Sequence, residues 1–141
     1  MEHHLVLAAL GGDKTGIVDE ISRTATESKC SIADSRMVVM GQEFSIIMML
    51  SGTWDAIAKF ESQVHLLEER LNLSIITKRT QARAPQRESI PYRIDVVALD
   101  NPGIVDDIAN FFASQQMNIE ALETSTYAAP HTGSPMFALS M

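Results

Sequence analysis

Apolar and polar positions repeat with two different periods along the first eighty residues, and the change of period marks the expected elements. Apolar runs at residues 5–10, 32–40, 44–50 and 73–80 are typical of short buried or half-buried strands. Between them, residues 15–29 and 54–72 carry apolar side chains three and four positions apart. That spacing predicts two helices, each with one apolar face.

The order strand, helix, strand, strand, helix, strand predicts an α+β fold of the ferredoxin-like βαββαβ type. We expect a four-stranded antiparallel sheet with two helices on one face, because each helix needs the sheet to bury its apolar stripe. Gly41 and Gln42 separate the second and third strands and predict a hairpin turn there.

A second unit of the same kind follows a polar stretch. Residues 81–91 contain two prolines and no apolar period, which predicts a linker between a first domain at 1–80 and a second at 92–141. In the second domain we expect a strand at 92–99, a helix at 102–116, a strand at 119–127, a loop at 128–135 and a strand at 136–141. The helix is expected to bury Ile104, Val105, Ile108 and Phe112.

The two domains are an internal repeat with a constant offset of 87 residues. Asp13, Gly16, Ile17, Val18, Asp19, Ile21 and Ile32 recur as Asp100, Gly103, Ile104, Val105, Asp106, Ile108 and Ile119. The second domain has no counterpart of residues 51–80, so its last helix and strand are missing. Because an incomplete sheet exposes an edge and an apolar face, we expect either a truncated form of a longer protein or a partner that completes the sheet.

The loop between the first strand and the helix of each domain is the main candidate for chemistry. Asp100 or Asn101 can cap the helix, Pro102 is expected near its first position, and Gly103 lets a ligand approach the backbone. A helix N-terminus favours a negative group such as a carboxylate. Two interpretations of these loops stay open: helix capping by Asp13 and Asp100, and ordering around a bound amino acid.

Charge and composition exclude several classes. The net charge is −7, and residues 92–141 carry six acids and one base, which argues against nucleic-acid binding. Cys30 is the single cysteine, so a disulfide within the chain or a multi-cysteine zinc site is excluded, and no matching ligand pair accompanies His3 and His4. We find no phosphate loop, no nucleophile elbow and no membrane-spanning run, and we expect a cytoplasmic protein without metal or cofactor.

The doubled unit with Asp-x-x-Gly-Ile-Val before each first helix resembles the ACT domain, a small regulatory module that often binds amino acids. ACT domains commonly associate side by side, with effector sites at the interface, so the resemblance implies a homo-oligomer. Their ligands contact the loop after the first strand and the start of the second strand. The ligand-binding residues implied here are Asp100, Asn101, Pro102, Gly103, Asn118, Ile119, Asp13, Gly16 and Ser31.

Two tandem ACT units, with an opening at residues 7–18 of the type Leu-Ala-Ala-Leu-Gly-Gly-Asp-Lys-Thr-Gly-Ile-Val, are similar to the family of bacterial glycine cleavage system transcriptional repressors. This resemblance implies a non-enzymatic regulator that responds to glycine and acts through a LysR-type activator protein without touching DNA. Two alternatives remain: the N-terminal ACT regulatory portion of a larger metabolic enzyme, and a small ferredoxin-like enzyme.

Overall fold

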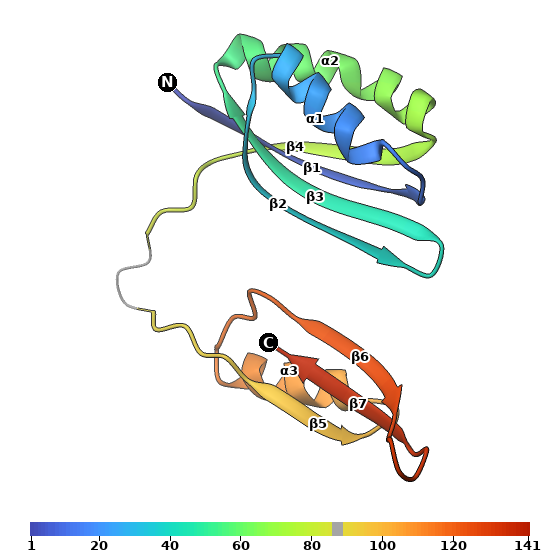
Figure 1. Ribbon diagram of the computed structural model, residues 1–141. Helices are drawn as coiled ribbons and strands as arrows, with labels where there is room; N and C mark the ends of the chain where they lie inside the picture. The colour runs from blue at the N-terminus through green and yellow to red at the C-terminus, as the bar shows by residue number, and fades with distance from the viewer. Residues whose placement is uncertain (86–88) are drawn as a thin grey trace. The chain divides into compact units, whose positions relative to one another are not determined.

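The computed structural model describes residues 1–85 and 89–141, and the chain divides into two compact units. Unit 1 comprises Met1–Pro85 and unit 2 comprises Gln86–Met141 (Figure 1). The division falls within the predicted linker, of which residues 86–88 lie outside the described residues. In the described parts of the chain, none of the helices is long and apolar enough to cross a membrane.

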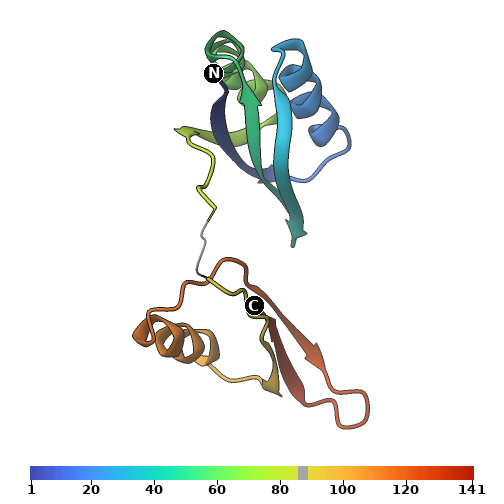
Figure 2. The same cartoon turned by 90° about the vertical axis from the view of Figure 1, so that its left-hand side faces the viewer.

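Unit 1 is a four-stranded antiparallel sheet with two helices on one face (Figures 1 and 2). Its elements are β1 (His3–Gly12), α1 (Ile17–Glu27), β2 (Ser31–Met40), β3 (Glu43–Gly52), α2 (Trp54–Leu71) and β4 (Leu73–Thr80). The strand order is β2-β3-β1-β4, so β2 and β4 are the edge strands. This arrangement confirms the predicted α+β, ferredoxin-like fold.

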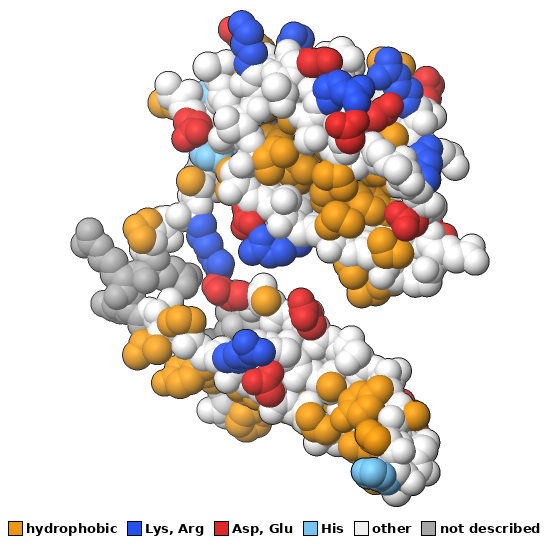
Figure 3. Space-filling model, in the orientation of Figure 1, with side chains coloured by type: hydrophobic (Ala, Val, Ile, Leu, Met, Phe, Trp, Pro, Cys, Tyr) orange, Lys and Arg blue, Asp and Glu red, His pale blue; other side chains and the backbone are white. Residues whose placement is uncertain are grey.

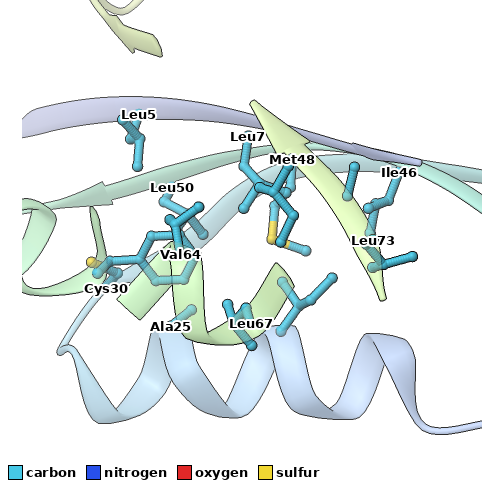
Figure 4. Packing of buried hydrophobic residues seen from close by; sticks show 14 of the residues in the cluster. Leu5, Leu7, Ala25, Cys30, Ile46, Met48, Leu50, Val64, Leu67 and Leu73 are labelled. Carbon is cyan, nitrogen blue, oxygen red and sulfur yellow. The ribbon is translucent and has the colours of Figure 1, made fainter. Parts of the chain in front are cut away.

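The core of unit 1 lies between the sheet and the two helices. Side chains on β1 and β3 alternate, so that Leu5 and Leu7 pair with Leu50 and Met48 on the helix-facing side. Figure 4 shows these side chains pointing toward the helices. The fully buried Phe60 of α2 belongs to the same cluster. The predicted helical spacing identifies the buried face of α2, and on α1 it identifies Ile17, Ile21 and Ala25, whereas Val18, which the same spacing placed on that face, is exposed.

Unit 2 has a smaller, three-stranded sheet and one helix. Its elements are β5 (Asp95–Leu99), α3 (Ile104–Ser114), β6 (Glu123–Ala128) and β7 (Pro135–Ser140). The antiparallel order is β5-β7-β6, with the two buried side chains, Phe137 and Leu139, on the central strand. Pairing continues one step past β5, because Ile94 and Met141 exchange two backbone hydrogen bonds of 2.9 Å.

Two expectations for unit 2 are wrong in part. The strand expected at 119–127 begins only at Glu123, because Glu123 already pairs with Ser140, the last residue of β7, and residues 119–122 have no strand partner there. The apolar face of α3 is not fully buried: Ile104, Ile108 and Phe112 are half-buried, and Val105 is exposed. In unit 1 the second helix and fourth strand complete the enclosure of α1, whereas unit 2 has one helix over three strands.

Candidate functional site

The two loops that lead into α1 and α3 have the same backbone conformation. Gly16 has φ 93° and ψ 0°, and Gly103 has φ 93° and ψ −1°. A Cβ added at either glycine would meet nothing within 4 Å. The left-handed backbone, which L-residues rarely adopt, is therefore the reason for glycine at both positions. The repeat read from the sequence is thus also a repeat in three dimensions.

Neither helix is capped by a side chain, which contradicts the capping prediction for Asp13, Asp100 and Asn101. Gly16 and Gly103 themselves occupy the N-cap positions, where no side chain is available to accept a hydrogen bond. The Asn101 side chain instead donates from Nδ2 to the Leu99 carbonyl at 3.5 Å.

The backbone of both aspartates hydrogen-bonds the loop to a residue far away in the sequence. The Asp13 N–H donates to Gln42 O at 2.9 Å, in the β2–β3 turn, and the Asp100 N–H donates to Pro135 O at 2.9 Å, at the start of β7. Pro102 lies directly before the N-cap residue Gly103. It is not at the first helical position, because α3 begins at Ile104. Each loop is therefore held by a backbone hydrogen bond at its aspartate, and the helix begins directly after its glycine.

The open N-terminus of α3 combines donors with negative charge. The first intrahelical bond runs from Asp107 N to Gly103 O at 2.9 Å, so the N–H groups of Ile104, Val105 and Asp106 have no intrahelical acceptor. The helix dipole favours an anion there, while Asp106 and Asp107 in the first turn already bring two carboxyl groups. A zwitterion, which carries both a carboxylate and an ammonium, matches this combination better than a simple anion.

The opposite ends of α1 and α3 also repeat each other. Lys29 and Gln116 both have positive φ, of 62° and 56°. The next residues, Cys30 and Met117, donate from N–H to the carbonyls of Ala25 and Phe112, each at 2.9 Å. All three pairs of positions differ by 87. This turn leads to Ser31 in unit 1 and Asn118 in unit 2. Ser31 opens β2, whereas Asn118 lies five residues before β6.

Within one unit, the structure does not bring the predicted ligand-binding residues together. Asp100, Asn101, Pro102 and Gly103 are exposed at the N-terminal end of α3, and Asn118 and the half-buried Ile119 follow its C-terminal end. The 11-residue helix separates the two groups by roughly 16 Å.

The predicted residues of unit 1 are separated in the same way. The Asp13–Gly16 loop follows Gly12, which pairs with Glu43, whereas Ser31 pairs with Ser51 at the other end of β3. Eight residues of strand correspond to roughly 27 Å, so a small amino acid cannot touch both groups of one unit.

A second feature of unit 1 was not found from the sequence. A hollow of about 170 Å³ lies against β1, β2 and β3, lined by Val6, Asp34, Ser35, Arg36, Ile47, Met48 and Met49. Arg36 Nη1 donates to Asp34 Oδ1 at its rim, and this bond holds the pKa of the Asp34 carboxyl below its usual value. The available signal was the spacing of two opposite charges two residues apart, which places both on one side of a strand.

The described residues offer little else for catalysis or metal binding. No group of three or more His, Cys, Asp or Glu side chains suited to a metal occurs within residues 1–85 and 89–141. Cys30 is buried, and burial raises the pKa of its thiol, which keeps it in the unreactive protonated form.

Comparison with known proteins places these features in a family. The ACT domain model matches residues 3–78. The glycine cleavage system transcriptional repressors of Escherichia coli K12 and Shigella flexneri are each 40% identical over 130 residues, covering 91% of this chain and 67% of the relative.

Two crystal structures match 99% of this chain and 80% of their own. One, described as a glycine cleavage system transcriptional repressor, has a TM-score of 0.75 at 30% identity. The other, an unknown protein from Galdieria sulphuraria, has a TM-score of 0.78 at 25% identity. The repeated glycine loops, the ferredoxin-like sheet and these similarities agree: the chain belongs to the ACT-domain family and is similar, within it, to the glycine cleavage system transcriptional repressors.

Proposed function

We propose that this chain is a non-enzymatic regulator that binds a small amino acid, glycine in the first place, and controls another protein. The observation that carries the proposal is the open helix N-terminus behind Gly103, which offers backbone donors beside carboxyl groups. A sequence relative named as a repressor of the glycine cleavage system supports a regulatory role and glycine as the effector. Neither DNA binding nor a cofactor is part of this proposal.

The effector site is formed by two copies of unit 2, because the predicted residues of one copy lie too far apart. β6 is an edge strand of its sheet. If the β6 strands of two copies pair antiparallel, the start of one strand lies beside the end of the other. Ala128, at the end of β6, pairs with Pro135, to which the Asp100 N–H also donates. The Asp100–Gly103 loop of one copy then lies at the same end as the partner's Asn118.

In such a site the two charged groups of the ligand have separate receptors. The N–H groups at the start of α3 donate to the carboxylate, with the helix dipole contributing. The Asp100 carboxyl and the side-chain oxygen of the partner's Asn118 accept from the ammonium, since an amide can both donate and accept. Glycine, which has no side chain, fits a site where two chains approach closely.

Regulation then follows from coupling between ligand binding and self-association. A ligand held by two copies stabilises their paired state relative to the separate state. The protein partner, a LysR-type transcriptional activator by family resemblance, distinguishes these two states. The acidic unit 2, with six acids and one base at residues 92–141, supports action through a protein and not on DNA.

Isothermal titration calorimetry of the whole chain with glycine, serine and alanine tests the proposal. Saturable glycine binding is expected, and Asn118→Ala should weaken it about tenfold or more, since a charged ligand loses one hydrogen bond. Asn110→Ala is the matched control, because Asn110 is an exposed asparagine on α3 away from both ends. Unchanged affinity in Asn118→Ala would remove Asn118 from the site. The absence of binding by all three ligands to the folded chain would refute the effector proposal.

A further inference from the structure

One face of the unit 1 sheet carries apolar side chains but no helix. Both helices cover the other face (Figure 1). Alternation along the strands places every second residue on the uncovered side, which we call the outer face. Its apolar residues are Val6, Ala8, Leu10, Val38, Met40, Ile47, Met49 and Ile76. Ile47 is 52% exposed and Ile76 is 72% exposed. A contiguous apolar surface of this kind is typical of an interaction site.

The strand register arranges the outer face in rows that cross all four strands. One row runs Lys78, Val6, Met49, Asp34 from β4 to β2, and the next runs Ile76, Ala8, Ile47, Arg36. A base therefore stands at one end of the first row and an acid at its other end. The second row has the most exposed apolar side chain of this face at its β4 end.

The hollow of about 170 Å³ lies at the opposite side of this face from Ile76. Asp34, Arg36, Ile47 and Met49, which line it, belong to β2 and β3, whereas Ile76 belongs to the other edge strand, β4. The outer face thus has a projecting side chain on one edge and a depression toward the other, at the same level along the strands.

We infer that the outer face binds the outer face of a second copy, related by a two-fold axis parallel to the strands. Such an axis exchanges the two ends of each row. It places the partner's Ile76 over the hollow beside Arg36 and the partner's Lys78 opposite Asp34. By symmetry, Ile76 and Lys78 of the first copy make the same two contacts with the partner. Aligned sheets pack face to face in this way about 10 Å apart. The contact is isologous, as in most homodimers.

A second copy fits this face because its charges complement themselves. Asp34 Oδ1 accepts from Arg36 Nη1 and from the Ser35 N–H, and the other carboxylate oxygen is an acceptor for the partner's Lys78. The hydrogen bond from Arg36 lowers the pKa of the Asp34 carboxyl, which is an ionised acceptor at neutral pH. Figure 3 shows charges of both signs scattered among apolar side chains on the visible surface of unit 1. This interface lies in unit 1, so it is independent of the effector site proposed for unit 2.

Cross-linking with a short thiol-specific reagent tests the inference on the whole chain, because backbones about 10 Å apart across packed sheets are too far for a direct disulfide. The pair Asp34→Cys and Lys78→Cys introduces thiols on the two edge strands of unit 1. Three strand spacings separate them within one copy, about 14 Å, with both side chains on the same face, whereas across the inferred interface the two side chains point toward each other. A reagent whose reach is well below about 14 Å can therefore join only two copies. The native Cys30 is buried and does not compete.

With this reagent the paired variant should form a covalent dimer on a denaturing gel. The matched control is Leu66→Cys with Lys78→Cys, since Leu66 is an exposed residue of α2 on the other side of the sheet. Adding Ile76→Asp to the first pair should reduce cross-linking at least tenfold, and circular dichroism checks that this exposed substitution leaves the fold intact. Failure to cross-link, equal cross-linking in the control pair, or no effect of Ile76→Asp in the folded chain would each overturn the inference.

Discussion

Replacing Gly16 by alanine should destabilise unit 1 although the methyl group meets no other atom. Gly16 has φ 93°, and nothing lies within 4 Å of the position of an added Cβ. The loss in the free energy of unfolding therefore comes only from the backbone conformation. A left-handed conformation costs an L-residue about 1–2 kcal/mol. Alanine also lowers the conformational entropy of the unfolded chain, which stabilises the folded state by about 0.4–1 kcal/mol. The net loss is about 1 kcal/mol.

Gly12 offers a control in the same unit. An added Cβ there also meets nothing within 4 Å, but Gly12 ends β1 and does not have a positive φ. Gly12→Ala should therefore stabilise unit 1 by about 0.5 kcal/mol through the unfolded state. Gly11 would be an unsuitable control, because its Cβ would lie 2.6 Å from Leu73 Cδ2. The two useful variants should differ by about 1.5 kcal/mol.

Urea unfolding followed by tryptophan fluorescence measures this difference. Trp54 is the single tryptophan, and it lies in α2 of unit 1, so the signal reports on this unit. With a urea dependence of about 1 kcal/mol per molar for a domain of this size, the midpoints should differ by about 1.5 M. Gly16→Asn should fall between them, because asparagine tolerates the left-handed region. Equal midpoints for Gly16→Ala and Gly12→Ala would refute the backbone argument.

Three further predictions concern the core, the buried thiol and a surface cluster of unit 1. Phe60→Ala should cost about 3–5 kcal/mol and lower the thermal midpoint, because Phe60 is fully buried; a loss below about 1 kcal/mol would contradict the packing. Because burial raises the pKa of the Cys30 thiol, its contribution to stability should be present below pH 9.0 and lost as pH rises toward the raised value; urea midpoints that do not decline there would contradict this. Arg79→Met should change Trp54 fluorescence but alter stability by less than about 1 kcal/mol, because the Arg79–Glu61 pair is partly exposed; an unchanged spectrum would show that the guanidinium, 5.3 Å from the ring centre, does not affect the indole.

The local sequence determined the elements of unit 1 and the repeat. Apolar spacing along α2 identifies the side chains that the structure buries, and the offset of 87 between Gly16 and Gly103 reappears as the same dihedral angles. These features depend on short-range periodicity and on the special backbone freedom of glycine. Both can be read from neighbouring residues.

Two features depended on contacts between distant residues, so only the tertiary structure decided them. The capping prediction was wrong because the N–H groups of Asp13 and Asp100 donate to distant residues, Gln42 in the β2–β3 turn and Pro135 in β7, while glycine takes the N-cap. The expected start of the strand at Ile119 was wrong because strand length depends on the partner strand β7.

The separation of the loop from Asn118 could not be seen in a list of motif residues. Both groups adjoin the same helix in the sequence, yet a helix holds its two ends apart by its length.

The sequence by itself therefore determined which segments form helices and strands and where the chain repeats. The tertiary structure decided what those segments present to a partner. A register shift between Ile32 and Asp34 shows the physical reason. One extra residue in β2 moves Asp34 and Arg36 to the outer face of the sheet, since side chains alternate with a period of exactly two residues. No local pattern in the sequence predicts that register shift, because it arises from pairing with β3.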